Sequence, residues 1–460
     1  MLLPKPLISP TAARCAKSLV SLSPGRSAWA LVIILLSCCT AASAEVHTLT
    51  LREALDFAAR QNPDVLLSRL DAQRAEQGIR VAKDPFSPKV FGGSGLAWTS
   101  GYPNTIDGNA PSIFEAKTNM SLFNRPASYQ VAEARENARG AQMDAQAKSD
   151  EVAYRTAIQF LDVLEMAKQV EVLSQQVPSL TKVVETMKAR VEEGSELGVE
   201  SKRAAVNLAS ARQRLEAATA DLEYAETLLA VTIGYPASDR VQAVQPETVA
   251  GPEVKSEEEC VDLALKQSRQ LQRFQSTVLA KELEIRAQNA QRLPQVGLVA
   301  QYALFGSYNY QNYFTKFQAN NGQLGVSITV PLLVGSAAKA LADQAATDIA
   351  KLRLQMNDTR NQIAVNTRRT YQQWKKAEGA RNIAQMQLEL AREDLSVLIA
   401  QMTEGRAPLS RVEQARVAEN ERWIQLYAAE IQLQRARLAV LRETGTLVAA
   451  LRAEPDSHQP

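Results

Sequence analysis

Side chains that could carry out chemistry are scarce in this chain of 460 residues. Its two histidines, His47 and His458, lie near the ends, so the body of the chain offers no imidazole for a catalytic triad or a histidine-based metal site. The sequence contains no GxSxG, P-loop or HExxH motif and no cluster of cysteines. We therefore predict that the protein is not an enzyme and has no catalytic residue, metal site or cofactor.

The charge balance and composition argue against further classes of protein. Lys plus Arg number 52 and Asp plus Glu number 50, so a net charge of +2 gives no basis for binding nucleic acid through bulk charge. Hydrophobic residues make up 45% of the chain, which is enough for extensive cores and rules out a wholly disordered protein. Aromatic residues make up 5%, with 20 glycines and 19 prolines, and this shortage of sheet and turn formers disfavours an all-β fold.

The N-terminal segment has the layout of a secretory signal. Residues 1–28 carry basic side chains and no acidic one, an apolar run follows from Trp29 to Leu36, and small residues end at Ala44. The apolar run of about eight residues is far shorter than the ~20 residues of a membrane-spanning helix. We predict a signal peptide over residues 1–44 and a mature chain that starts at Glu45.

The cysteines allow a second interpretation of this segment. The run Leu35-Leu36-Ser37-Cys38 is similar to a bacterial lipobox, and the mature chain would then begin at a lipid-modified Cys38. Plain cleavage and lipidation both remain open at this stage. Because Cys15, Cys38 and Cys39 lie in or beside the signal, only Cys260 stays in the mature body, and intrachain disulfides cannot support the fold.

The mature sequence contains an internal duplication. Residues 53–90 align without a gap to residues 259–296, an offset of 206, and the offset grows to 211 by the point where Gly234 corresponds to Gly445. The predicted parts of the chain are a first repeat over 45–234, a linker over 235–255, a second repeat over 256–450 and a polar tail over 451–460.

Each repeat is expected to open with a helical stretch and to continue with strands. Helical spacing covers residues 50–83 and 256–292, and Pro63 should break the first stretch after Asn62. Alternation of apolar and polar residues then predicts two strands in each repeat. The predicted strands cover residues 88–102, 114–122, 295–304 and 324–330.

A very long helix follows each pair of strands, over about 127–193 and 337–402. About 66 residues at 1.5 Å each make a rod of roughly 100 Å, and Pro178 should kink the first rod. A shorter helix returns from each rod, and in the first return helix leucine and alanine each recur every seven residues. These positions are Leu208, Leu215, Leu222, Leu229, Ala204, Ala211, Ala218 and Ala225. The pattern predicts antiparallel coiled-coil hairpins, and the fold class is mainly α with a small β part.

Four amphipathic strands are too few to close a barrel in a membrane, since about eight is the minimum. Open sheet edges in hydrocarbon would leave backbone groups without partners, at several kcal/mol each. If the strands enter a membrane, several chains must therefore share one barrel, and three chains would supply 12 strands. Residues 305–321, rich in Tyr and Phe, fit an external loop and aromatic girdle of such a barrel, or alternatively a loop packed on a soluble sheet.

The sequence resembles the outer membrane efflux protein family, the TolC-like channels, over about residues 46–450. The resemblance lies in the opening LTLREALDFAARQNPDV, the strand entries SPKV and LPQV, the EG turns and the duplicated layout. It implies a homotrimer in the outer membrane of a Gram-negative bacterium, with a 12-stranded β-barrel in the lipid and an α-helical tunnel across the periplasm. It also implies a passive export duct that works with a periplasmic adaptor protein and an inner-membrane transporter, in efflux or type I secretion.

The resemblance further suggests roles for the two turns between the long helices. In the family these tips contain a glycine followed by Leu or Thr, Asp and Val. The corresponding candidates for adaptor docking are Gly194, Leu197, Val199, Gly405 and Leu409. Candidates for a constriction of the tunnel are Glu200, Arg411 and Gln414. Arg411 stands where an acidic residue is usual, so it would weaken a cation-selective ring or pair with Glu200 or Glu413 of another chain; alternatively it is a solvated surface charge.

Two other functions remain as alternatives. A periplasmic adaptor or a structural coiled-coil spacer would also contain a helical hairpin, but normally only one, and no lipid-facing strands. An enzyme is disfavoured because the many carboxylates lie on amphipathic helices, where solvation and i, i+4 pairing explain them. The exported substrate, and the choice between drug efflux and protein secretion, cannot be inferred from these residues.

Overall fold

The computed structural model describes residues 45–95, 112–195, 197–244, 254, 256–305, 318–333 and 335–452. The predicted signal peptide with Cys38, most of the aromatic loop at 305–321, and nearly all of the predicted tail lie outside the described residues. The chain divides into two compact units, residues 1–46 and 47–460. The arrangement described below is that of the second unit.

The opening helices of the two repeats break at equivalent places. Helices α3 (Leu51–Gln61) and α4 (Pro63–Lys83) meet at Asn62, whose side chain accepts hydrogen bonds from the first backbone N–H groups of α4. Proline in the first position of a helix is favourable, so the predicted break at Pro63 is confirmed. Helices α7 (Glu257–Gln267) and α8 (Arg269–Asn289) also break, at Ser268, although a single long helix was predicted there. Serine caps a new helix without the strong signal that proline supplies.

A four-stranded antiparallel sheet follows the opening helices of both repeats. It contains β2 (Lys89–Gly93), β3 (Ser112–Phe123), β5 (Gln295–Phe305) and β6 (Asn320–Thr329), in the order β2-β3-β5-β6. The central pairing, β3 with β5, joins the two repeats and places Lys117 opposite Gln301. Short 3₁₀ turns, η1 (Asp84–Phe86) and η2 (Ala290–Arg292), lead into the sheet. Of the predicted strand over 88–102, the structure describes residues 88–95, and strand β2 ends at Gly93.

A second, two-stranded sheet was not predicted. It pairs β1 (Val46–Leu49) with β4 (Arg240–Ala243), and the Val244 N–H donates to the Leu49 carbonyl oxygen at 3.0 Å. Strand β4 lies inside the segment predicted to be a linker, so this part of the linker is structured. Strands of four residues are too short to show a clear alternating pattern.

The two rods were predicted closely. Helices α5 (Arg125–Glu192) and α9 (Ser336–Thr403) each contain 68 residues, or about 100 Å of helix, and α5 continues through Pro178. The return helices are α6 (Gly198–Ile233) and α10 (Leu409–Glu443), and the short α11 (Leu447–Arg452) follows α10. The heptad alanines Ala211, Ala218 and Ala225 are buried, as expected of small residues in a close helix–helix seam.

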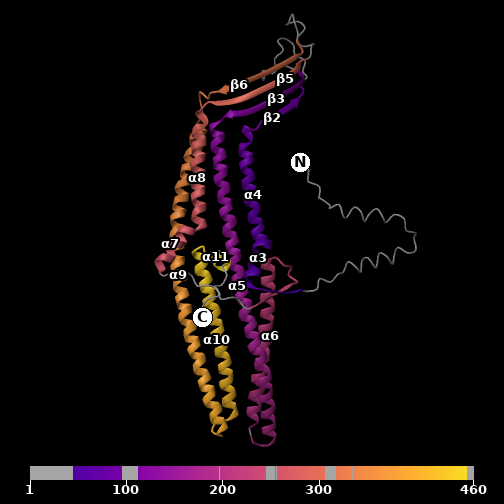
Figure 1. The fold of residues 1–460 in the computed structure, drawn as a ribbon, viewed down its shortest axis with the longest axis vertical. Helices are drawn as coiled ribbons and strands as arrows, with labels where there is room; N and C mark the ends of the chain where they lie inside the picture. The colour runs from indigo at the N-terminus through magenta and orange to yellow at the C-terminus, as the bar shows by residue number, and fades with distance from the viewer. Residues whose placement is uncertain are drawn as a thin grey trace, which may run out of the picture. The chain divides into compact units, whose positions relative to one another are not determined.

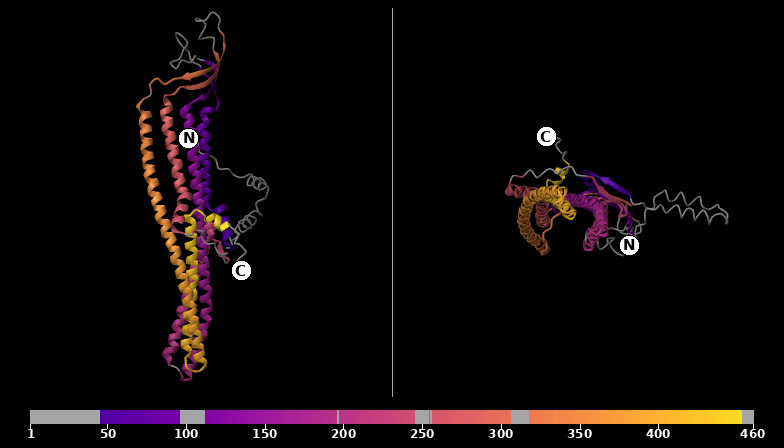
Figure 2. Two further views of the ribbon diagram at one scale, coloured as in Figure 1. Left: turned by 60° about the vertical axis from the view of Figure 1, so that its left-hand side comes forward. Right: turned by 90° about the horizontal axis from the view of Figure 1, so that it is seen from below.

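The helices next to the four-stranded sheet lie side by side in the same order as the strands to which they connect. In the half next to the four-stranded sheet the order is α4, α5, α8 and α9, and in the other half α5 and α9 pack against α6 and α10 (Figures 1 and 2). The main core lies where the two halves meet and includes Phe160, Leu161, Leu229, Ile233 and Leu438, all fully buried. The packing at mid-length therefore holds both repeats together and directs each hairpin away from the sheet.

Two equivalent glycines end the hairpins at this core. Gly234 has φ 107° and Gly445 has φ 71°, a region that favours glycine. A Cβ on Gly234 would lie 2.8 Å from the Cβ of Gln61, and one on Gly445 would lie 3.1 Å from the amide oxygen of Gln267. Each hairpin thus ends against the C-terminus of its own opening helix, at repeat-equivalent residues.

We predict that Gly234→Ala lowers the stability of the protein by about 2 kcal/mol or more, because the side chain adds both backbone strain and a steric clash. Gly379→Ala is the matched control, since Gly379 lies inside α9 and a Cβ added there would meet nothing within 4 Å. The control should be neutral or stabilising by about 0.5–1 kcal/mol. The apparent melting temperature in detergent measures both, and equal values for the two variants would contradict this account.

Candidate functional site

The tips of the two hairpins are built alike but expose different surfaces. Gly194 and Gly405 have φ of 73° and 74°, which lets each long helix end in a left-handed turn. In the first tip, Leu197 is 74% exposed and Val199 is 62% exposed. In the second tip, by contrast, Ala407 and Val412 are buried. Leu409 is the first residue of α10, and its side chain lies outside the described part of the chain, as does Glu196 of the first tip.

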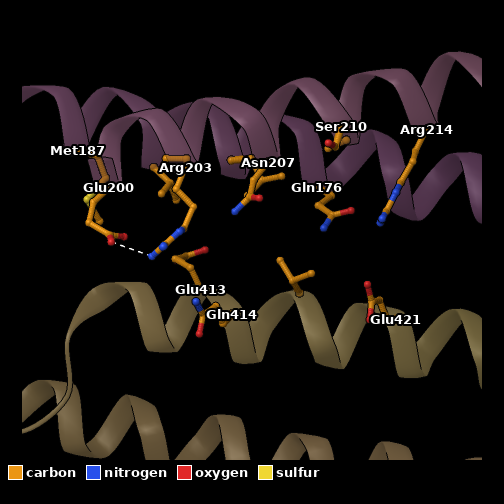
Figure 3. A pocket seen from close by; sticks show the side chains of 15 residues that line it. Gln176, Met187, Glu200, Arg203, Asn207, Ser210, Arg214, Glu413, Gln414 and Glu421 are labelled. Atoms are coloured by element: carbon orange, nitrogen blue, oxygen red, sulfur yellow. Dashed lines mark hydrogen bonds and ion pairs between the residues drawn. The ribbon is translucent and has the colours of Figure 1, made fainter. Parts of the chain in front are cut away.

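Near the tips, a pocket of about 350 Å³ lies between the hairpin of α5 and α6 and the helix α10 (Figure 3). Two of the predicted constriction residues, Glu200 and Gln414, line it together. The Arg203 Nη1 donates to the Glu200 Oε1 at 2.7 Å, within the first turns of α6. Glu413 and Glu421 from α10 and Arg214 from α6 also line the pocket, so it presents charges of both signs.

The third predicted constriction residue, Arg411, is not among the residues that line this pocket. Its side chain is exposed, near the start of α10. The two carboxylates suggested as its partners in another chain already have ion pairs within this chain: Glu200 with Arg203, and Glu413 with Arg416 at 3.3 Å. The structure therefore brings Glu200 and Gln414 to one pocket, and Arg411 lies outside its lining, one turn of α10 before Gln414.

A cluster of ion pairs between α10 and α5 joins the two repeats and was not foreseen. The Arg435 Nη2 of α10 donates to the Glu165 Oε2 of α5 at 2.7 Å and also to the Asp162 carboxylate. Arg442 of α10 lies over the ring of Tyr154 of α5, 4.7 Å from its centroid. The ion-pair partners of Arg435 are 270 and 273 residues away from it in the sequence, so no local pattern could have revealed them. They tie the second hairpin to the first rod beside the core.

Several ionisable groups are partly or fully buried near the core end of the hairpins. Burial raises the pKa of the Glu443 carboxyl, with the nearby Arg442 opposing it, and burial likewise raises the pKa of Glu226 against the effect of Arg240. Burial, reinforced by repulsion from Glu443, raises the pKa of the Cys260 thiol to about 11. A buried thiol of this kind is unreactive, which favours a structural role for Cys260.

Within the described ranges, no helix carries a stretch apolar enough, over sufficient length, to traverse a bilayer. The same residues contain no group of three or more His, Cys, Asp or Glu side chains placed to hold a metal ion. The features that remain are two helical hairpins with exposed tips, an amphipathic sheet at the far end and a duplicated chain. They define a class of protein in which long hairpins extend from a shared sheet, as in channels of the outer membrane.

Comparison with known proteins agrees with this class. The model of the outer membrane efflux protein family matches residues 54–235 and 260–446, and the chain belongs to this family. As a member of this family it is an outer membrane efflux protein, so its place in the cell is the outer membrane and its function is efflux. None of the curated proteins compared with the chain matches it.

Solved structures show the same fold at low sequence identity. The CmeC outer membrane channel of Campylobacter jejuni is 12% identical with a TM-score of 0.70, over 86% of each chain. The outer membrane protein VceC of Vibrio cholerae is 15% identical with a TM-score of 0.68, over 86% of this chain and 96% of that one. The open state of the MtrE outer membrane channel of Neisseria gonorrhoeae is 13% identical with a TM-score of 0.65, over 86% and 89%.

Glu443 provides a test of the buried charge at the core. Because burial raises the pKa of the Glu443 carboxyl in the folded protein, the fold favours the protonated form over the ionised form. The stability that this preference contributes is present at low pH and is lost as pH rises through the raised pKa. We predict that Glu443→Gln raises the apparent melting temperature at about pH 8. The gain should vanish near pH 4, where the carboxyl is protonated in the folded protein. Glu216→Gln, at an exposed position of α6, is the control and should show no such pH-dependent gain.

Proposed function

We propose that three copies of the chain assemble into one passive duct that serves a tripartite efflux or type I secretion system. The observation that carries this proposal is the sheet: its two outer strands, β2 and β6, each pair on one side only within the described chain. Every residue of β6 is exposed, and the large apolar side chains of Leu324, Val326 and Ile328 occupy alternate positions on it. Four strands cannot close on themselves, whereas three copies supply 12 and pair every edge.

In this proposal the hairpins continue the barrel as a tunnel, and the tips receive a periplasmic adaptor. The exposed apolar side chains of Leu197 and Val199 support a docking role for the first tip. Gly194 and Gly405 shape the tips, and Leu409 begins the return helix of the second. An inner-membrane transporter supplies the energy, and this chain supplies the route without catalysing a reaction. We also retain residues 45–234 and 256–450 as the two repeats that form it. Both contain two short helices, a 3₁₀ turn, two strands, a long helix and a return helix in that order, to which the first adds β1 and the second adds α11.

The proposal is tested by size and by conductance. Native mass spectrometry of the detergent-solubilised protein should give a mass of three chains, and the same material should open discrete ion-conducting pores in a planar lipid bilayer. The protein should sediment with the outer membrane fraction of the producing cell. A monomer that forms no pore in lipid would refute the duct.

If the first tip binds the adaptor, charged substitutions at its exposed apolar residues should weaken that binding. We expect Leu197→Asp combined with Val199→Asp to reduce adaptor binding about tenfold or more, since a charged pair replaces an apolar contact surface. Trimer mass and pore conductance should not change. Val206→Asp, an exposed apolar position on the same helix away from the tip, is the matched control. Binding is measured with the purified periplasmic adaptor of the same export system; undiminished binding by the tip variant would place docking elsewhere.

We further propose that Glu200, Gln414 and Arg411 narrow the periplasmic end of the tunnel. Glu200 and Gln414 line one pocket, and the exposed guanidinium of Arg411 lies near the tip of the same helix as Gln414. A trimer would place three copies of Glu200 and three copies of Arg411 around this end of the tunnel. Such a ring of charged side chains should influence whether cations or anions pass more easily.

We expect Arg411→Glu to shift the pore toward cations and Glu200→Lys to shift it toward anions. The reversal potential in a KCl gradient across a planar bilayer measures both shifts. Arg369→Glu makes the same change of charge at an exposed position of α9, far from the tip, and should leave the reversal potential unchanged. If Arg411→Glu behaves like this control, Arg411 is a solvated surface charge and not part of the constriction.

A further inference from the structure

Pro178 interrupts the backbone hydrogen bonds of the first rod. Helix α5 continues through this residue, but the proline nitrogen carries no hydrogen, so it makes no bond to the carbonyl oxygen of Ser174 one turn earlier. One turn later, the Thr181 hydroxyl donates to the Val177 carbonyl oxygen at 2.8 Å, a contact that often bends helices. The Pro178 side chain is exposed, so packing does not require it. Positions of this kind are where long helices bend.

This proline separates a fixed part of the first hairpin from the part that carries the tip. Pro178 lies about 14 residues, or about 21 Å of helix, beyond Leu164 in the main core. It lies about 16 residues, or about 24 Å, before Gly194 at the tip. On the core side, the Arg435 Nη2 of α10 donates to the Glu165 Oε2 of α5 at 2.7 Å, so this part of the first rod is held against the second hairpin.

On the tip side, the pocket of about 350 Å³ separates the two hairpins (Figure 3). Leu180 and Val183 of α5 and Val417 of α10 are among the side chains that line it. Arg214 of α6 and Glu421 of α10, both in the described part of the chain, extend toward each other from opposite walls without reaching ion-pair distance (Figure 3). The apolar surfaces and the opposite charges would both gain from a narrower gap.

The second hairpin is built more rigidly at the same level. The duplication places Glu389 of α9 at the position of Pro178, and this residue keeps its backbone N–H. Arg392 of α9 pairs with Glu419 of α10 at 3.4 Å and lies 4.9 Å from the ring centroid of Trp423, also of α10. These contacts tie the two helices of the second hairpin to each other.

Two ion pairs of the first hairpin instead stay within one helix. Lys168 pairs with Glu171 inside α5 at 2.8 Å, and Glu200 pairs with Arg203 inside α6 at 2.7 Å. The buried side chains where α5 faces α6 include Leu173 and other apolar or small residues, among them Val184, Ala211 and Ala218. Apolar contacts are non-directional, so they tolerate a small bend better than ion pairs of fixed geometry.

We propose that Pro178 is a hinge at which the tip part of the first hairpin bends toward α10, while the second hairpin stays straight. The bend narrows the pocket, brings Arg214 and Glu421 to ion-pair distance and covers Leu180. In the proposed trimer the hairpins form the tunnel wall side by side, so a narrower gap in every subunit reduces the width of the periplasmic end. This inference rests on the proposed duct and assigns its moving part to the first hairpin.

Disulfide formation across the pocket measures the bend. In Asn207→Cys/Val417→Cys the two thiols come from opposite walls, α6 and α10. Copper phenanthroline should oxidise this pair within single chains of the detergent-solubilised protein, as followed by mass spectrometry after alkylation. Adding Pro178→Ala should slow the oxidation about fivefold or more, because alanine restores the helix hydrogen bond and stiffens the rod. The native Cys260 should not compete, since its buried thiol has a pKa of about 11.

Two controls locate the effect at the hinge. Glu389→Ala makes a change to alanine at the equivalent exposed position of α9 and should leave the oxidation rate unchanged. Gln169→Cys/Asn420→Cys joins α5 to α10 on the core side of Pro178, and its oxidation should not respond to Pro178→Ala. The hinge is overturned if Pro178→Ala leaves the Asn207→Cys/Val417→Cys rate unchanged, or if it slows both cysteine pairs equally.

A charge swap tests the closed state. With the Asn207→Cys/Val417→Cys pair in place, Arg214→Glu should slow the oxidation, because two carboxylates then face each other across the gap. Adding Glu421→Arg should restore at least half of the lost rate, since it rebuilds the opposite charges in exchanged positions. An absence of recovery would overturn the assignment of this ion pair to the closed state.

Single-pore recording separates the hinge from the duct. In a planar lipid bilayer, Pro178→Ala should raise the mean conductance of single pores, because a straight first hairpin keeps the gaps between hairpins wide. Glu389→Ala should match the wild type. A trimeric, conducting protein in which Pro178→Ala leaves the mean conductance unchanged would remove the hinge while the duct stands. A wild-type protein that is monomeric and forms no pore would remove both proposals.

Discussion

Backbone groups on the outer edges of β2 and β6 must find hydrogen-bond partners, and this requirement shapes the rest of the molecule. In water an exposed strand edge is a liability, and in hydrocarbon an unpaired N–H or C=O costs several kcal/mol. Within one chain the sheet offers pairing only as far as the order β2-β3-β5-β6. In the proposed trimer, closure comes from further copies of the chain, because a rotational assembly satisfies every edge at once.

The helices obey the order that the sheet imposes. Each strand is continuous with one helix, so the row α4-α5-α8-α9 repeats the row of strands, and the hairpins extend from it beyond the core. Gly234 and Gly445 sit against equivalent glutamines, Gln61 and Gln267, so both repeats close on their own opening helices by the same device. The two repeats are therefore similar in shape, and they differ in the side chains that they expose.

Those differences concern charge and exposure more than shape. The first tip exposes Leu197 and Val199, while the second buries Ala407 and Val412. The contact between α5 and α8 inside the chain contains ion pairs, while the exposed faces of α4 and α9 carry apolar side chains.

The sequence by itself determined the periodic features: the four strands, the rods, the break at Pro63, the heptad of α6 and the duplication. Each follows from side-chain spacing over many residues, which local geometry translates directly into strand or helix. The sequence did not predict strands β1 and β4, because four residues are too few to show an alternating pattern. It did not predict the helix break at Ser268 either, because a single serine is a weak signal for a new helix. Only the tertiary structure decided that Arg435 bridges to Asp162 and Glu165, that Glu200 and Gln414 share a pocket, and that Arg411 does not line this pocket. Such contacts join residues more than 200 positions apart, and their geometry depends on how the rods pack, which no local spacing records.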